Sequence, residues 1–333
     1  MDRQILQIKE LKKYFKVQKP FRFKNVFKKA QHKTVKAVDG VSFNVFVGET
    51  IGLVGESGCG KTTIGRLILR AIDITDGTIQ FNGKAIEALA GNELMDFRKQ
   101  VQVIFQDPYL SLNPRKSTRN IIAEPLLIHK MVSPAEIKDK TIELMELVGI
   151  DPNLRTLYPY ELSTGQQKRI AIARAIATNP TLLIADEATS GLDVSVKAQV
   201  LNLLADLREK LGLTYVFISH DLGVVQYVAH KVAIMYLGRI VEFGDTQTIF
   251  NNPLHPYSVA LLGSIPKVRE IGEVRIPFKS SLKGEIPSPI DLPLGCRFQS
   301  RCPKRMKRCL ESDPELVEID EGHKVSCYLY NQL

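Results

Sequence analysis

Short apolar runs alternate with longer amphipathic stretches along most of the chain. Continuous apolar runs of strand length occupy residues 49–54, 181–185 and 214–219. Apolar residues recur at helical spacing over 134–148 and 194–211. Buried strands that alternate with helices are typical of a mostly parallel sheet with helices on both faces. The pattern therefore predicts an α/β core.

The two ends of the chain follow other patterns. Residues 5–11 and 35–47 predict two strands, joined by a long basic hairpin arm. Another strand is predicted over 78–82 and an Ala-rich helix over 166–178. Pro and Gly become frequent from Asn251 onward and the periodicity fades there. We therefore expect a core domain over 1–250 and a small irregular module over 251–333.

The composition is that of a globular protein with room for one large domain and a small extra module. The chain has 333 residues, of which 44% are hydrophobic. No stretch approaches the roughly 20 apolar residues of a transmembrane helix, and the first residues lack the apolar centre of a signal peptide. We expect a cytoplasmic protein that reaches a membrane only through partners that span it.

The net charge of +9 is unevenly distributed. Eleven Lys or Arg residues and a single acid, Glu10, lie between Lys9 and Lys36. A solvated surface excursion is the leading interpretation of this run, and a contact with anionic lipid is the second. Nucleic acid ranks third, because the run has no interleaved aromatic residues on a recognisable nucleic-acid-binding fold.

The strongest local motif lies between the strand predicted at 49–54 and a helix that begins near Lys61. It is Gly55-Glu56-Ser57-Gly58-Cys59-Gly60-Lys61-Thr62, followed by Thr63, and it fits the phosphate loop G-x-x-x-x-G-K-[ST] in the expected strand–loop–helix setting. The glycines let backbone N–H groups converge on phosphate oxygens, and the helix offers its positive end. We expect Lys61 to reach the β- and γ-phosphates, Thr62 to bind Mg²⁺, and Cys59 to be a filler.

A second motif follows the apolar strand at 181–185. This strand ends in Asp186 and Glu187. An acid at this place in a phosphate-loop protein suits Mg²⁺, here Asp186, and its neighbour Glu187 suits polarisation of the attacking water. The alternative, a solvated strand terminus, is weakened by the phosphate loop upstream in the same predicted sheet.

Further motifs identify a family resemblance when they are taken together. Leu162-Ser163-Thr164-Gly165-Gln166 resembles the ABC signature, usually LSGGQ, and Gln106 matches the Q-loop glutamine. Ser190-Gly191-Leu192-Asp193 matches the D-loop, and His220 matches the switch histidine. The set stands in family order over roughly 35–250. The chain thus resembles an ABC-type P-loop ATPase, with an antiparallel β subdomain and a helical subdomain near 107–178.

The resemblance implies a mechanism that needs two such domains, closed head to tail over two ATP molecules. Ser163, Gly165 and Gln166 would contact the ATP of the partner domain. Glu187 would act as the catalytic base and His220 would hold the γ-phosphate, while Gln106 would coordinate Mg²⁺. Tyr14 is the candidate to stack on adenine, with Phe15 as its rival.

Within that family the chain is similar to the importers of oligopeptides and dipeptides. The segments that carry the likeness are Phe105-Gln106-Asp107-Pro108-Tyr109-Leu110-Ser111-Leu112-Asn113-Pro114-Arg115 and Asn252-Pro253-Leu254-His255-Pro256-Tyr257. The resemblance is to the ATPase chain often called the F-type subunit. It implies a second, homologous ATPase chain, two transmembrane permease subunits, a substrate-binding protein, and a place at the cytoplasmic face of the membrane.

Four of the five cysteines crowd into the C-terminal segment, at Cys296, Cys302, Cys309 and Cys327. Clustered cysteines in a cytosolic chain favour metal over disulfides. Their spacing fits neither the usual zinc pairs nor the ferredoxin patterns, so it leaves zinc, an iron–sulfur cluster and plain thiols open. Similar tails in peptide-importer ATPases imply a [4Fe–4S] cluster, with zinc as the alternative. Six basic residues would offset its charge: Arg297, Arg301, Lys304, Arg305, Lys307 and Arg308.

Other functions agree less well with the sequence. Import of oligosaccharide or nickel is an alternative that would use the same type of ATPase subunit. ABC ATPases of translation usually carry two ATPase domains, and those of DNA repair insert long coiled coils before the signature; the chain shows neither feature. An iron–sulfur sensor with a vestigial ATPase fold predicts loss of the catalytic acid, yet Glu187 is present. Thr164 replaces the first signature glycine, and we expect the composite site that uses it to hydrolyse more slowly.

Overall fold

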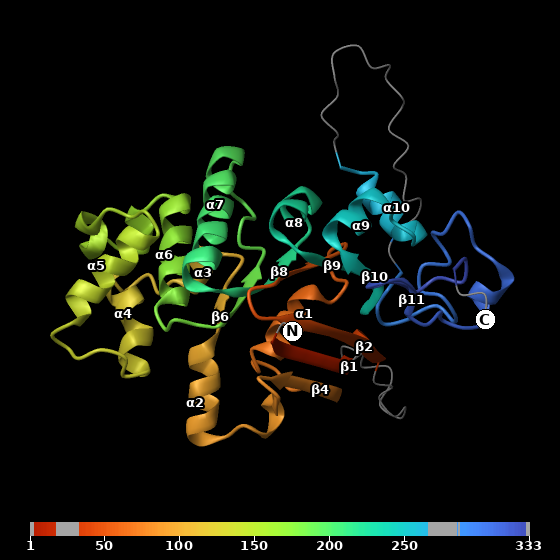
Figure 1. Ribbon diagram of the computed structural model, residues 1–333, viewed down its shortest axis with the longest axis horizontal. Coiled ribbons are helices and arrows are strands. Elements are labelled where there is room, and N and C mark those ends of the chain that lie inside the picture. Colours follow the sequence, from red (N-terminus) through yellow and green to blue (C-terminus); the bar gives the residue numbers. More distant parts are fainter. Residues whose placement is uncertain (1–2, 18–32, 266–284, 286, 331–333) are drawn as a thin grey trace, which may run out of the picture.

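The computed structural model describes residues 3–17, 33–265, 285 and 287–330 as two β-sheets with helices (Figure 1). The larger sheet has eight strands in the order β11-β12-β10-β9-β3-β8-β7-β6, and the smaller has four in the order β2-β1-β4-β5. The strands are β1 Gln4–Val17, β2 Lys33–Phe46, β3 Thr50–Val54, β4 Asp76–Phe81, β5 Lys84–Ala85, β6 Val101–Ile104, β7 Leu182–Asp186, β8 Thr214–Ser219, β9 Lys231–Tyr236, β10 Arg239–Asp245, β11 Val317–Asp320 and β12 His323–Val325.

The centre of the larger sheet is parallel, as the apolar runs predict. Strands β6, β7, β8, β3 and β9 pair in parallel in that order. Alternate side chains of β7 enter two different cores: Leu183 and Ala185 face one, while Leu182 and Ile184 face the other. Because both faces of the sheet are covered, both sets of positions must be apolar.

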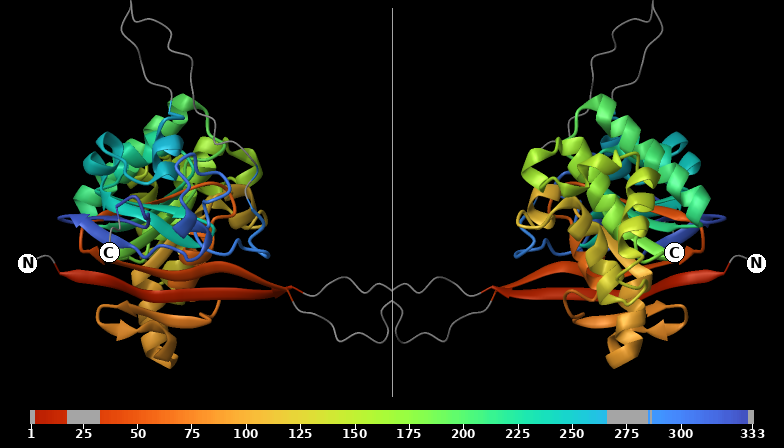
Figure 2. Two further views of the ribbon diagram at one scale, coloured as in Figure 1. Left: turned by 90° about the vertical axis from the view of Figure 1, so that its right-hand side faces the viewer. Right: turned by 90° about the vertical axis from the view of Figure 1, so that its left-hand side faces the viewer.

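The predicted N-terminal strands form the smaller sheet. β1 pairs antiparallel with β2, with Ile8 opposite Phe43 and Lys13 opposite Val38. Together they form the long two-stranded ribbon seen from the side in Figure 2. The tip of the predicted basic arm, residues 18–32, lies outside the described residues.

The helices separate into groups around the sheets. They are α1 Lys61–Ile68, α2 Gly91–Gln100, α3 Pro108–Ser111, α4 Thr118–Ile128, α5 Ile137–Leu147, α6 Thr164–Ile176, α7 Val194–Leu211, α8 Leu222–Val228, α9 Thr246–Asn251 and α10 Pro256–Leu262. Helices α4, α5 and α6 gather at one end of the molecule, opposite the C-terminal segment (Figure 1). These helices fall inside the range predicted for a helical subdomain.

Local signals set the ends of helix α7 where the sequence pattern predicts them. The Asp193 side chain accepts a hydrogen bond from the backbone N–H of Val196, which caps the first turn. Gly212 ends the helix with φ of 64°, a left-handed conformation that glycine adopts without a steric penalty.

The C-terminal segment is more regular than the sequence predicts. Strand β12 pairs antiparallel with β10, and β11 pairs with β12, so this segment extends the larger sheet. The buried carboxylate of Glu242, in β10, accepts hydrogen bonds from the backbone of Leu254 and His255 and lies 2.8 Å from Nε2 of His323. The module expected to be irregular thus contributes two short strands, because long-range pairing supplies order that local periodicity does not predict.

Within the described ranges, no helix combines the length and apolar character needed to cross a bilayer.

Candidate nucleotide-binding and catalytic site

The phosphate loop connects the end of β3 to the start of α1. Its three glycines all have positive φ angles, 149° at Gly55, 79° at Gly58 and 111° at Gly60, and the contacts of Gly55 and Gly60 add a steric demand. A Cβ atom at Gly55 would lie 2.2 Å from the carbonyl oxygen of Met235, and one at Gly60 would lie 2.3 Å from that of Ala37. Both positions therefore require glycine for conformational and steric reasons.

Lys61, the first residue of α1, points back into this loop. Its Nζ donates to the carbonyl oxygens of Gly55 at 2.7 Å and Glu56 at 3.0 Å, and the residue is 5% exposed. The Cys59 thiol is buried beside it, and burial raises the pKa of this thiol. Lys61 is thus a cation held inside the phosphate loop, while Cys59 is kept as a neutral thiol.

The predicted acidic pair lies at the end of β7, facing the same loop. The Thr62 hydroxyl donates to Oδ1 of Asp186 at 3.1 Å. Burial raises the pKa of Asp186, and the neighbouring Glu187 adds to this rise. These two side chains supply oxygen atoms, the ligands that Mg²⁺ prefers, beside a phosphate loop.

Two further predicted residues, Gln106 and His220, contact the carboxylate of Glu187. Nε2 of Gln106 donates to Oε2 at 2.7 Å, and Nδ1 of His220 lies 3.2 Å from Oε1. Glu187 itself has φ of 48°, an uncommon conformation for a residue other than glycine. The structure thereby joins three residues that the sequence places in separate loops, at the mouth of the phosphate loop.

A cavity of about 510 Å³ lies over these groups. Nine of its lining residues are predicted site residues: Ser57, Gly58, Gly60, Lys61, Thr62, Thr63, Gln106, Glu187 and His220. Four more lining residues are Val35, Ala37, Ser190 and Pro289. Ser190 belongs to the D-loop motif, which the sequence analysis identifies. Nothing in the sequence pattern signals Pro289, which comes from the C-terminal segment.

Tyr14 does not line this cavity. Its hydroxyl donates to Asp39, and burial together with this bond raises the pKa of Tyr14 to about 12. The Lys36 ammonium lies 5.5 Å from the centre of its ring. Phe15, the rival for adenine, is 38% exposed, with the Lys13 ammonium 5.2 Å from its ring.

The signature residues also lie away from the cavity, at the start of α6. Ser163 and Gln166 cap the helix reciprocally: the Ser163 hydroxyl accepts from the Gln166 backbone at 3.3 Å, and Oε1 of Gln166 accepts from the Ser163 backbone at 2.9 Å. Ser163 is exposed, and Gly165 is half-buried beside it. These residues are accessible to another molecule while remaining outside the cavity of their own chain.

Helix α6 also holds the Q-loop through Lys168, a residue that the sequence did not single out. Its Nζ donates to the carbonyl oxygens of Phe105 at 3.1 Å and Gln106 at 2.8 Å. Burial lowers the pKa of Lys168 to about 8, although Asp107 and Asp186 oppose this shift. Lys168 therefore connects the signature helix to the backbone of Gln106.

The four C-terminal cysteines are free thiols, close enough for their charges to affect one another's pKa. The Cys296 backbone donates to the carbonyl of Cys309 at 2.8 Å. Burial, and to a smaller extent the neighbouring thiols, raises the pKa of Cys296 to about 12 and that of Cys327 to about 11. In the part of the chain that the structure describes, no group of three or more His, Cys, Asp or Glu residues is arranged to hold a metal ion.

Two of the six basic residues predicted to offset a cluster charge are engaged elsewhere. Arg297 pairs with Asp39, and Arg301 pairs with Glu56. Hydrogen bonds from Tyr14 and Arg297 hold the pKa of Asp39 below its usual value, although burial opposes them.

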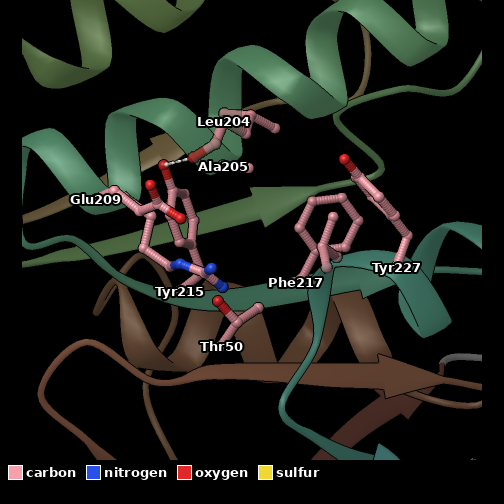
Figure 3. Close-up of a pocket in the computed structure, with 9 residues that line it drawn as sticks. Thr50, Leu204, Ala205, Glu209, Tyr215, Phe217 and Tyr227 are labelled. Atoms are coloured by element: carbon pink, nitrogen blue, oxygen red, sulfur yellow. Dashed lines mark hydrogen bonds between the residues drawn. The ribbon is translucent and has the colours of Figure 1, made fainter.

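A second cavity, of about 230 Å³, lies between α7, α8 and β8, away from the phosphate loop (Figure 3). Tyr215 and Phe217 form its floor, with the Tyr215 hydroxyl donating to the carbonyl of Leu204 at 3.2 Å. Arg208 and Glu209 are its charged lining residues. None of the predicted site residues lines it, whereas nine of them line the larger cavity.

Two protein-family profiles match parts of the chain. A family profile described as "ABC transporter" matches residues 38–190, which span the phosphate loop, the signature and the acidic pair. A second profile, described as "Oligopeptide/dipeptide transporter, C-terminal region", matches residues 241–309.

Curated relatives match nearly the whole chain. The oligopeptide transport ATP-binding protein AppF of Bacillus subtilis is 47% identical over 98% of this chain and 98% of its own length. The dipeptide transport ATP-binding protein DppF of Haemophilus influenzae is 45% identical, covering 96% of this chain and 94% of its own.

Solved structures match the ATPase fold. A dimeric post-hydrolysis structure of the ATP-binding cassette MJ0796, bound to ADP and Pi, has a TM-score of 0.63 and 25% identity, covering 73% of this chain and 99% of that one. The cbiO1 protein of Clostridium perfringens, part of the ABC transporter complex cbiONQ, has a TM-score of 0.62 and 26% identity, covering 78% of this chain and 96% of its own.

Proposed function

The chain belongs to the ATP-binding subunits of oligopeptide and dipeptide ABC importers, an ATP-hydrolysing family, and we propose how its residues perform that hydrolysis. The observation that carries the proposal is the meeting of Gln106, Glu187 and His220 over the phosphate loop. A carboxylate, a histidine and an amide are thereby held where the γ-phosphate of a bound ATP would lie.

The phosphate loop binds the triphosphate, and Lys61 supplies the cation that neutralises its charge. Thr62, Asp186 and Gln106 offer the oxygen atoms that would hold Mg²⁺, which balances charge on the transferred phosphoryl group. Glu187 accepts the proton of the attacking water, and His220 orients that water and the γ-phosphate. Of the remaining loop residues, Ser57, Gly58, Gly60 and Thr63 line the cavity and would position the phosphates through their backbone N–H groups and side chains.

A complete hydrolytic site needs a second ATPase chain. Ser163, Gly165 and Gln166 are accessible but lie outside their own cavity. They would complete the site of a homologous partner in a head-to-tail heterodimer, where the N-terminus of α6 faces the γ-phosphate. Thr164 adds a Cβ and a hydroxyl at that contact, so we propose that the composite site using it is the slower of the two. Tyr14 would contact adenine once the ribbon adjusts to the nucleotide.

The exposed side of the helical subdomain is the proposed contact with the two permease subunits. Tyr109 and Leu110 are adjacent in α3 and are 64% and 82% exposed. They lie three and four residues after Gln106, so movement of the Q-loop at the nucleotide would reach this surface. The chain would thus act at the cytoplasmic face of the membrane, within a complex that also includes a substrate-binding protein.

We also propose that the chain divides into an ATPase domain over 1–250, with its helical subdomain near 107–178, and a C-terminal extension over 251–333. The extension would carry a [4Fe–4S] cluster on Cys296, Cys302, Cys309 and Cys327. Mutual proximity of the thiols supports this assignment. The lack of a metal-holding group of side chains among the described residues weighs equally against the cluster and against zinc, its alternative. Metal analysis after anaerobic purification tests it: about four iron and four sulfide per chain are required.

The experiment that tests the function is ATP hydrolysis by the reconstituted complex, with its binding protein loaded with peptide, oligosaccharide or nickel. Stimulation by peptide alone is expected. Stimulation by sugar or nickel alone would agree with the assignment as an importer ATPase and would contradict peptide as the transported solute. Glu187→Gln in this chain is the inactive control, and loss of hydrolysis in this variant is required by the role given to Glu187.

A further inference from the structure

The turn between Cys296 and Cys302 is inserted into the ATPase core. Its Phe298 is 1% exposed, and the Phe298 ring lies 5.3 Å from that of Tyr236 and 5.5 Å from that of Tyr257, measured between centroids. The Arg301 backbone N–H donates to the Phe298 carbonyl at 3.0 Å, which fixes the turn. The packing of Phe298 therefore determines where Arg301 lies.

Arg301 extends from this turn into the phosphate loop. Its two terminal nitrogens donate to the two carboxylate oxygens of Glu56 at 2.6 and 3.0 Å, a bidentate pair. The Arg301 side chain is only 4% exposed, and its guanidinium lies 5.8 Å from the Tyr236 ring and 5.9 Å from the Phe298 ring. Aromatic faces on the same cation restrict it to this orientation.

Glu56 is held through its backbone as well. Its N–H donates to the Tyr257 hydroxyl at 3.0 Å, and its carbonyl accepts from Lys61 at 3.0 Å. Glu56 is nevertheless a carboxylate inside a loop built to receive a triphosphate. An unpaired negative charge there would repel the ligand, because like charges oppose one another strongly at a partly buried site.

We propose that Arg301 is a positioning residue of the nucleotide site, which neutralises Glu56 and holds the phosphate loop ready for nucleotide. The C-terminal segment is in this view part of the ATP-binding machinery. The inference rests on nucleotide binding at the phosphate loop, as proposed above.

Other contacts of the same segment support this role. Arg297, on the same turn, pairs with Asp39 and donates to the Leu237 carbonyl. Pro289 lines the nucleotide cavity, and Asp291 pairs with Lys33 at 2.8 Å. The segment therefore touches the cavity wall and the strand β2 that flanks it, besides the phosphate loop.

The test is ADP affinity of the full-length chain with Mg²⁺, measured by calorimetry, for Arg301→Met, Glu56→Gln and the double variant. Arg301→Met should weaken ADP binding about tenfold, as expected when a charged partner is left unpaired. Glu56→Gln alone should change affinity by less than about threefold, because it removes the repulsive charge together with the bond. The double variant should recover to within about threefold of wild type, since no unpaired carboxylate remains.

Recovery by Glu56→Gln is the decisive readout, because a merely structural role for Arg301 would not produce it. The matched control is Lys324→Met, which removes a surface cation of the same segment, 41% exposed and 3.8 Å from Glu318, and should leave affinity unchanged. Equal affinity of wild type and Arg301→Met, no recovery in the double variant, or an equal loss in the control would each overturn the inference. If Arg301→Met does not fold, Arg301→Lys replaces it in the cycle, with a smaller loss that Glu56→Gln still reverses.

Failure of the proposed function gives a different result. In that case wild type itself does not bind ADP, or Lys61→Ala binds as well as wild type.

Discussion

Replacing Lys168 with methionine tests two opposing contributions of this buried lysine to the stability of the folded protein: the cost of burying its charge and the gain from its hydrogen bonds. The charged side chain is removed from water, and burial lowers its pKa from 10.5 to about 8. That shift corresponds to a penalty of about 3 kcal/mol in the folded state at neutral pH. Its hydrogen bonds to the Phe105 and Gln106 carbonyls offset the penalty, at about 1.5–3 kcal/mol each.

The two bonds together offset this penalty by about 3–6 kcal/mol, so the variant should lower the free energy of unfolding by no more than about 3 kcal/mol. Methionine also keeps the apolar stem of the side chain packed in the core. Lys168→Met should therefore lower the melting temperature by no more than about 5 °C. The link between the signature helix and the Q-loop, in contrast, is lost completely, because methionine offers no donor to the two carbonyls.

The assay compares basal and peptide-stimulated ATP hydrolysis by the reconstituted complex. With Lys168→Met we expect the peptide-stimulated rate to fall about tenfold, while ATP affinity stays near that of wild type because Lys168 does not line the nucleotide cavity. Lys138→Met, an exposed lysine of α5, is the matched control. A melting temperature lowered by more than about 10 °C with an unchanged stimulation ratio would refute the reasoning and make Lys168 a stability residue.

Three further predictions follow from single contacts. Burial lowers the pKa of His255 to about 3, below its usual 6.5, so this residue should cost the folded protein about 1.4 kcal/mol of stability per pH unit as the pH falls from about 6.5 towards 3. The melting temperature of wild type should therefore fall across this range. His255→Asn, which can still cap α10, should not show this contribution to the fall. Thr164→Gly should raise the ATPase rate of the complex about threefold if Thr164 slows the composite site, and an unchanged rate would rule that role out. Tyr14→Ala should weaken ATP binding several-fold while leaving inorganic tripolyphosphate binding unchanged, as expected of a residue that contacts only adenine.

The sequence pattern predicts those elements whose causes are local. Continuous apolar residues identify β7 and β8 because these strands are buried on both faces. The limits of α7 follow from Asp193 and Gly212, which act on the helix ends next to them. The phosphate loop can be predicted equally well, because the residues that carry its chemistry are consecutive in the sequence.

The remaining features depend on contacts between distant parts of the chain. Strand β11 is largely exposed and β12 has three residues; β12 forms on the edge that β10 provides, and β11 pairs with β12 in turn. Pro289 in the nucleotide cavity and the pair of Arg301 with Glu56 have no counterpart in periodicity or motif spacing. Lys168 likewise looks like an ordinary helix residue until the Q-loop is packed against it. The local sequence pattern carries no information on these contacts, because they depend on the tertiary packing of distant segments.

The most direct test of the central claim is uptake of labelled peptide into vesicles that contain the complex, with ATP and Mg²⁺ supplied on the side of this chain. The account predicts ATP-dependent uptake with wild type, and loss of uptake with Glu187→Gln despite retained ATP binding. Uptake at the wild-type rate with Glu187→Gln would contradict the role of the Gln106, Glu187 and His220 group as the hydrolytic centre that drives import.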